Sequence, residues 1–162
     1  MGKTKTAAGK IEAFLDNARL LEDAFGIVPL LYGSLGLEYL TGEDLHADDI
    51  DILIPRVILK ERWMEFKDFL EKNGYTLTDE HEHTFASGGI SYSYAQIEEL
   101  ESFAGIPPEE IATHTAEGSS FRLLSLEQYL AVYTASSQDG YRIKTREKKD
   151  FEKIAFLKRR LQ

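Results

Sequence analysis

Apolar residues recur at helical spacing near the start of the chain, at Ile11, Phe14, Leu15, Ala18, Leu21 and Phe25. This period predicts an amphipathic helix over Ile11–Phe25, and Gly26 follows where a helix end favours a residue that tolerates positive φ. A short apolar run over residues 27–32 then predicts a buried strand, which Gly33 and Ser34 interrupt.

Over the next seventy or so residues, the spacing of apolar residues changes repeatedly between three to four residues, typical of helices, and two residues, typical of strands. The expected elements are a short helix at 35–40, a polar loop at 43–48, a strand at 49–54, a helix at Val57–Asn73, strands at 75–78, 83–85 and 90–94, and a short helix at 97–103. Helices and strands therefore mix without strict alternation, which predicts an α+β (α/β mixed-sheet) fold.

After Pro107-Pro108 the pattern predicts a hairpin over residues 111–124 and two helices. Ser125 is a good helix cap, with Gln128 three residues on, and the last helix is expected from about Glu147 to Leu161. We expect a core over residues 1–105, with a helical C-terminal extension at 106–162 packed on it as one compact unit.

Charge is distributed unevenly along the 162 residues, whose net charge is -9. Residues 141–162 hold nine of the 19 Lys and Arg residues but three of the 28 Asp and Glu residues. The acidic body argues against nucleic acid as a partner, because phosphate contacts need clustered Lys and Arg. The basic end either meets an anionic ligand or forms a solvated helix face, and the second alternative is favoured.

The absence of cysteine from the sequence excludes disulfide scaffolds and zinc–thiolate sites. No run is long and apolar enough to span a bilayer, and the polar, basic residues 1–10 do not form a signal peptide. We therefore expect a cytoplasmic protein without a membrane partner.

The stretch that carries chemistry joins Gly33-Ser34 to Asp49 and Asp51. Side chains two apart on a strand share a face, and two adjacent carboxylates are costly unless a cation lies between them. Mg²⁺ suits such a pair, because it combines one or two carboxylates with phosphate oxygens. Glycine lets the backbone approach a phosphate, and the following helix N-terminus favours an anion. The alternative is a solvated loop-to-strand junction beside an ordinary turn.

The pattern of an apolar residue, Gly33-Ser34, a spacer and then Asp49-Ile50-Asp51-Ile52 resembles the signature of the nucleotidyltransferase superfamily. The order of the elements over residues 11–103 is also similar to the core of that family. The resemblance implies transfer of a nucleoside monophosphate from a nucleoside triphosphate to a hydroxyl of a small molecule or a protein. It also implies that Asp49 and Asp51 bind Mg²⁺ and that Gly33 and Ser34 bind phosphate.

Two features depart from the family pattern. The spacer over residues 35–48 is longer than usual, so its loop, with Glu43, Asp44 and His46, is either displaced or itself shapes the site. Active members also present a third carboxylate from a later strand, which can act as a base on the acceptor hydroxyl. The strand over residues 89–95 has no Asp or Glu, so either Glu98 substitutes, or Ser91 or Ser93 occupies that place.

A second hypothesis follows from the missing acid: a catalytically degenerate member that binds a nucleotide or a protein partner.

Overall fold

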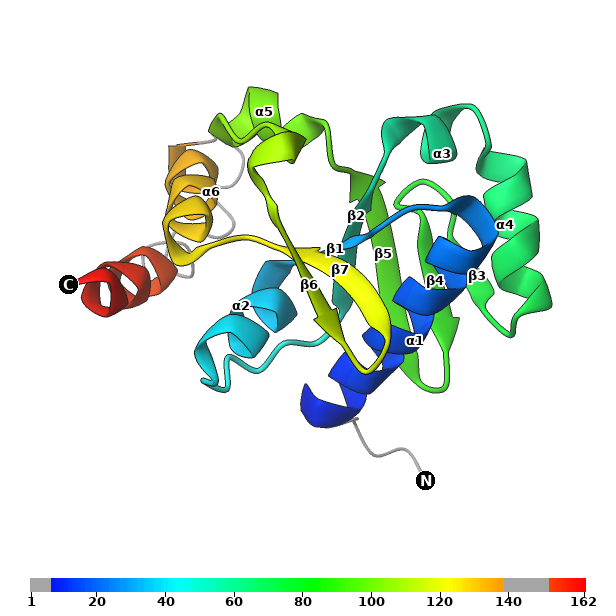
Figure 1. The fold of residues 1–162 in the computed structure, drawn as a ribbon, viewed down its shortest axis with the longest axis horizontal. Helices are drawn as coiled ribbons and strands as arrows, with labels where there is room; N and C mark the ends of the chain where they lie inside the picture. The colour runs from blue at the N-terminus through cyan, green and yellow to red at the C-terminus, as the bar shows by residue number, and fades with distance from the viewer. Residues whose placement is uncertain (1–6, 139–151) are drawn as a thin grey trace. The chain divides into compact units, whose positions relative to one another are not determined.

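A computed structural model describes residues 7–138 and 152–162 of the chain (Figure 1). They divide into two compact units. The first unit contains residues up to Ile97 together with Thr113–Leu123, and the second contains Glu98–Ala112 together with residues from Leu124 onward. The hairpin expected after Pro107-Pro108 is present, and its residues 113–123 belong to the first unit.

The first unit begins with helix α1 (Ala7–Phe25) and builds a mixed sheet. Its further elements are β1 (Leu30–Tyr32), α2 (Gly33–Thr41), β2 (Ile50–Ile54), α3 (Arg56–Lys60), α4 (Trp63–Lys72), β3 (Thr76–Asp79), β4 (Thr84–Ser87), β5 (Ile90–Gln96), β6 (Ala112–Ala116) and β7 (Ser119–Leu123). This order confirms the predicted α+β fold class with a mixed sheet.

Within residues 7–138 and 152–162, the strands lie in the order β3-β4-β5-β2-β1-β7-β6. Strand β2 pairs in parallel with β5, and β1 pairs in parallel with β7. The pairs β1–β2, β3–β4 and β4–β5 are antiparallel. Strand β2, which contains Asp51, therefore lies near the middle of the sheet and is hydrogen-bonded to β1 on one side and β5 on the other.

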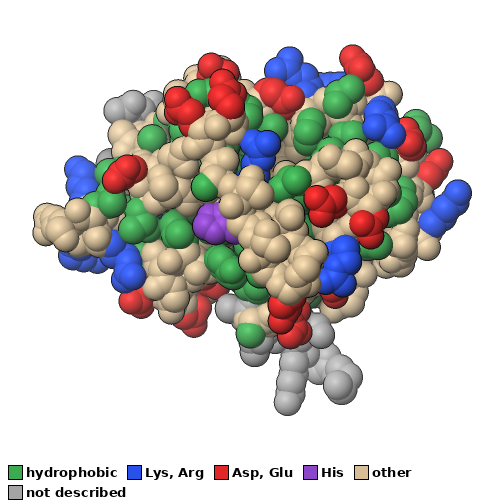
Figure 2. Space-filling view, in the orientation of Figure 1, with side chains coloured by type: hydrophobic (Ala, Val, Ile, Leu, Met, Phe, Trp, Pro, Cys, Tyr) green, Lys and Arg blue, Asp and Glu red, His purple; other side chains and the backbone are tan. Residues whose placement is uncertain are grey.

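Charged side chains of both signs are interspersed on the face of the described residues that Figure 2 shows. Clustered Lys and Arg are the usual surface for binding nucleic acid. The expectation that nucleic acid is not a partner stays a prediction.

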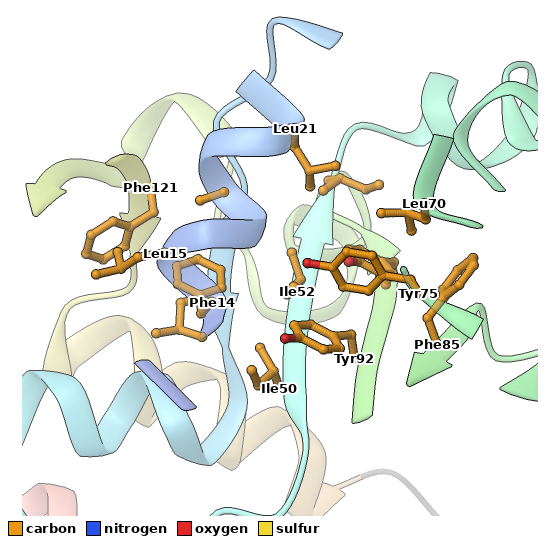
Figure 3. Packing of buried hydrophobic residues seen from close by; sticks show 14 of the residues in the cluster. Phe14, Leu15, Leu21, Ile50, Ile52, Leu70, Tyr75, Phe85, Tyr92 and Phe121 are labelled. Atoms are coloured by element: carbon orange, nitrogen blue, oxygen red, sulfur yellow. The ribbon is translucent and has the colours of Figure 1, made fainter. Parts of the chain in front are cut away.

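One face of the sheet is covered by α1 and carries the core of the first unit (Figure 3). Phe14 and Leu21 of α1 lie against Ile50 and Ile52 of β2, and all four side chains are fully buried. Because residues alternate between faces along a strand, Asp51 lies on the opposite face from these two isoleucines. Burial of the apolar face thus fixes the direction in which Asp51 points.

The prediction of a single helix over Val57–Asn73 is wrong, because the structure has two helices, α3 and α4, in its place. The backbone leaves helical geometry at Arg62, which has φ −120° and ψ 27°. The Arg62 guanidinium binds both carboxylate oxygens of Glu65 and lies over the Phe25 ring, 5.0 Å from its centroid. These contacts stabilise a break that the continuous apolar stripe did not predict.

The second unit is helical, with elements α5 (Glu99–Ala104), the 3-10 helix η1 (Pro108–Glu110), α6 (Leu126–Gln138) and a helix over residues 152–161. The predicted cap of α6 is confirmed, because the Gln128 N–H donates to Ser125 Oγ at 3.1 Å and the Ser125 N–H donates to Gln128 Oε1 at 2.9 Å. The start expected for the last helix, Glu147, lies outside the described residues.

Across residues 7–138 and 152–162, none of the helices has the length and apolar content needed to cross a membrane.

Candidate functional site

Gly33 forms the turn between β1 and α2, since β1 ends at Tyr32 and α2 begins at the next residue. Gly33 has φ 68°, in the left-handed region that glycine adopts without steric cost. A β-carbon at this position would come 2.5 Å from Asp51 Oδ2. Glycine is therefore needed here both for its conformation and for the close approach of a carboxylate.

Asp51 is the second residue of β2, and the antiparallel register places it opposite Tyr32 of β1. The side chain of Asp51 is half-buried, whereas Asp49, directly before the strand, is exposed. The structure thus brings Gly33 and Asp51 together, with Ser34 next to the turn and Asp49 next to the strand. Three sequence-predicted features, the turn, the helix start and the Asp-x-Asp strand, meet at this point.

The strand position beside Asp51 belongs to Ser93, because β2 and β5 pair in parallel with Asp51 opposite Ser93. Ser93 is also opposite Thr84 of β4, and the two hydroxyl oxygens are 2.9 Å apart in a hydrogen bond. Of the two serines considered from the sequence, Ser93 is therefore the one that pairs with Asp51. Which residue takes the place of the third carboxylate stays a prediction.

Glu98 follows β5, two residues after Gln96, which lies opposite Ile54. The pair Ile54–Gln96 lies three residues beyond the pair Asp51–Ser93, and Glu98 is the first residue of the second unit. Within the described residues, no three His, Cys, Asp or Glu side chains gather in an arrangement that could hold a metal ion. The sheet brings the Asp51 carboxylate to the Gly33 turn, and Asp49 directly precedes the strand. A third-carboxylate role for Glu98 stays a prediction.

The spacer between the two motifs consists of α2 and a loop over residues 42–48. Gly42 ends the helix with φ 76°, and its N–H donates to the Glu38 carbonyl oxygen. Two residues that the sequence reasoning missed, Lys10 and Glu38, contact this loop. Charged residues on helices give no sequence signal that separates such contacts from a solvated position.

Comparison with known proteins finds a sequence relative and a structural neighbour. The uncharacterized protein YnaI of Bacillus subtilis (strain 168) is 38% identical to the chain over 144 residues, which cover 89% of the chain and 92% of the relative. No protein-family model matches the chain.

The structural neighbour is the solution structure of the antibiotic-resistance factor ANT(2'')-Ia, an aminoglycoside nucleotidyltransferase, with a TM-score of 0.59 and 16% sequence identity. The match covers 94% of the chain and 85% of the neighbour. This likeness shows a nucleotidyltransferase-like fold.

Proposed function

The chain belongs to the family of the Bacillus subtilis protein YnaI, and we propose that it works as a Mg²⁺-dependent nucleotidyltransferase. It would move a nucleoside monophosphate from a nucleoside triphosphate to a hydroxyl of a small molecule or a protein. The observation that carries the proposal is the close approach of Gly33 to the Asp51 carboxylate. This contact joins a turn suited to phosphate to a side chain suited to a metal ion.

The donor set at the site fits Mg²⁺. Asp49 and Asp51 supply carboxylate oxygens, and Mg²⁺ is usually held by one or two carboxylates together with substrate phosphate oxygens and waters. Bound there, the ion would neutralise charge on the phosphates. The two aspartates would hold the metal, and without a phosphate ligand the pair would bind it weakly.

The phosphates would lie at Gly33 and Ser34. Helix α2 begins at this turn, and a helix N-terminus favours negative charge through its dipole. Ser34 adds a hydroxyl that can donate a hydrogen bond. The turn would therefore orient the triphosphate while the aspartates hold its metal ion.

In the transfer, the acceptor hydroxyl oxygen forms a bond to the α-phosphorus, and the bond from that phosphorus to the oxygen bridging to the β-phosphate breaks. Pyrophosphate leaves, and the hydroxyl proton passes to a base. The residue beside Asp51 is Ser93, which is not a base at neutral pH. The proton would pass to Glu98 or to solvent.

The Ser93–Thr84 hydrogen bond favours a second candidate function. A chain that keeps the turn and the Asp pair but has a hydroxyl pair in place of the third carboxylate could bind a nucleotide without transferring it. It would then act as a catalytically degenerate nucleotide- or protein-binding module.

The test of the site is a calorimetric titration with a non-hydrolysable nucleoside triphosphate, with and without Mg²⁺. We expect binding that requires Mg²⁺ and that Asp51→Asn weakens at least about tenfold, the loss of one charge-assisted contact. Asp68→Asn, which removes an exposed carboxylate on α4, is the matched control. Failure of the wild type to bind, or undiminished binding by Asp51→Asn, would reject the proposed site.

Pyrophosphate release separates the two functions. The wild type is incubated with a nucleoside triphosphate, Mg²⁺ and a panel of hydroxyl acceptors, and pyrophosphate is measured. An enzyme releases pyrophosphate when its acceptor is present, and Asp51→Asn abolishes the release. A binding module takes up the nucleotide in the titration and releases none with any acceptor.

A further inference from the structure

Two buried charged side chains of the first unit bind the same residue, Ala47, from different helices. Lys10 of α1 is 4% exposed and Glu38 of α2 is 7% exposed. Among the described residues, no other Lys, Arg, Asp or Glu residue is buried. The Lys10 ammonium donates to the Ala47 carbonyl oxygen. Glu38 Oε1 accepts the Ala47 N–H at 2.9 Å and the Leu45 N–H at 2.8 Å.

Burial of a charge is costly unless hydrogen bonds satisfy it. Here the backbone of one loop satisfies both charges, and hydrogen bonds to an ionised partner are about twice as strong as neutral ones. Removal of either side chain would leave Ala47 polar groups without their present partner. The energetic cost of burying Lys10 and Glu38 is therefore offset by contacts that hold the loop.

The loop over residues 42–48 also has local hydrogen bonds that set its path. The Glu43 N–H donates to Thr41 Oγ1 at 3.2 Å, and the His46 N–H donates to Asp44 Oδ1 at 2.9 Å. His46 itself has a positive φ of 56°. These bonds are on exposed residues, whereas the contacts to Ala47 are the ones that anchor the loop to α1 and α2.

The position of the anchor matters because a single residue, Asp48, separates Ala47 from Asp49. Asp51 is held in β2 by its pairing with β1 and β5, whereas Asp49 precedes the strand, so its position depends on the end of the loop. The contacts of Ala47 fix that end, on the same α2 helix that begins at Gly33. The turn and the aspartates are thus joined through α2 as well as through the pairing of β1 with β2.

We propose that Glu38 and Lys10 are positioning residues, which hold Ala47 and thereby set the place of Asp49 for metal–nucleotide binding. This inference rests on the proposed function of the site. It makes the longer spacer a built element of the site, and it assigns a role to two charged residues outside the motif.

The test compares Glu38→Ala, Glu38→Gln and Lys10→Met, with Glu71→Ala on α4 as the matched control for loss of an exposed helical carboxylate. Two quantities are measured on the same samples. One is the hydrogen-exchange rate of the Leu45 and Ala47 amides by NMR. The other is the Kd for a non-hydrolysable nucleoside triphosphate in Mg²⁺.

We expect Glu38→Ala to speed exchange at both amides and to raise the Kd about tenfold, as for loss of a hydrogen bond to a charged group. Glu38→Gln keeps an acceptor oxygen, so it should recover most of both effects. Lys10→Met keeps the length of the side chain but loses the donor to Ala47, so it should also raise the Kd. Glu71→Ala should change neither quantity.

Wild-type exchange rates at Leu45 and Ala47 in Glu38→Ala would overturn the inference, and so would faster exchange with an unchanged Kd. If Glu38→Ala does not fold, the test rests on Glu38→Gln and Lys10→Met. Wild-type amide exchange rates together with a wild-type Kd in Lys10→Met would then overturn the inference. Failure of the wild type to bind the nucleotide would instead reject the proposed function. The exchange rates would then decide by themselves whether Glu38 holds the loop.

Discussion

Gly33 and Asp51 lie so close together that any β-carbon on residue 33 would come 2.5 Å from the Asp51 carboxylate oxygen Oδ2. Real β-carbon contacts do not reach this distance, so a side chain at residue 33 would have to displace the carboxylate. The turn and the strand that carries Asp51 are therefore directly coupled. A substitution in the turn should change the position of the Asp51 carboxylate.

Gly33→Ala should weaken Mg²⁺-dependent nucleotide binding and destabilise the chain. The left-handed backbone costs a non-glycine residue about 1–2 kcal/mol, and the clash with Asp51 adds to it. Gly26→Ala is the control, because Gly26 has φ 67° and nothing within 4 Å of an added β-carbon. Urea denaturation should show a loss of unfolding free energy in both variants, and calorimetry a loss of binding in Gly33→Ala alone. Equal binding by the two variants would contradict the role given to this contact.

Ser93→Asp should create a site that responds more strongly to Mg²⁺. It would place a carboxylate opposite Asp51, and like charges at directly paired positions destabilise a sheet. We expect a lower unfolding free energy than the wild type without metal and a recovery when Mg²⁺ binds the folded state. The measurement is urea denaturation with and without Mg²⁺.

Ser93→Asn is the matched control for Ser93→Asp, since it has the same size and also disturbs the Thr84 hydrogen bond but adds no charge. If Mg²⁺ stabilises both variants equally, Ser93 does not face the metal site. If the proposed enzyme lacks its base, Ser93→Asp should also increase pyrophosphate release.

Short-range patterns predicted the turn and strand that carry the site, and also the cap of α6. Gly33-Ser34, Asp49-x-Asp51 and the Ser125–Gln128 cap each depend on residues close in sequence, so their local geometry follows from the residue types. The mixed sheet followed from the order of apolar periods. These are the parts in which local preference and the final fold agree.

Long-range contacts could not be predicted in the same way. The pairing of Asp51 with Ser93 depends on the register of β2 with β5, for which the sequence offered both Ser91 and Ser93. The break at Arg62 depends on a contact with Phe25. Lys and Glu side chains are usually exposed to water. The burial of Lys10 and Glu38 depends on hydrogen bonds with the Ala47 backbone, which lies far from Lys10 in sequence.

Ser125→Ala should destabilise α6 without affecting nucleotide binding by the first unit. The variant removes the acceptor of the Gln128 N–H, and loss of a Ser cap costs about 1 kcal/mol. Gln128→Ala removes the reciprocal bond to the Ser125 N–H and should also lower the unfolding free energy. The two losses should be less than additive, because each variant breaks the same capping box. Urea denaturation of the single and double variants checks this, and strictly additive losses would contradict it.

Alkaline pH should unfold the chain partly through Tyr94. Burial raises the pKa of Tyr94 well above its ordinary value of 10, and the neighbouring Tyr75 and Tyr92 add to the rise, while a hydrogen bond from Asn17 opposes it. Above pH 10 the unfolded chain loses this proton and the folded chain keeps it, so the free energy of unfolding falls as pH rises. Tyr94→Phe should show a shallower fall above pH 10, although it starts from a lower value at pH 7 because the Asn17 bond is lost.

The slope separates this effect from a general loss of stability, because a merely destabilised variant falls in parallel with the wild type. Tyr39→Phe removes the hydroxyl of a side chain that is 40% exposed and serves as the control. Urea denaturation between pH 7 and pH 11 gives the slopes. Since the Tyr94 hydroxyl lies in the core, on the opposite face of β5 from Ser93, nucleotide binding at pH 7 should survive Tyr94→Phe as long as the variant is folded. A slope equal to that of the wild type would mean that other groups govern the alkaline transition.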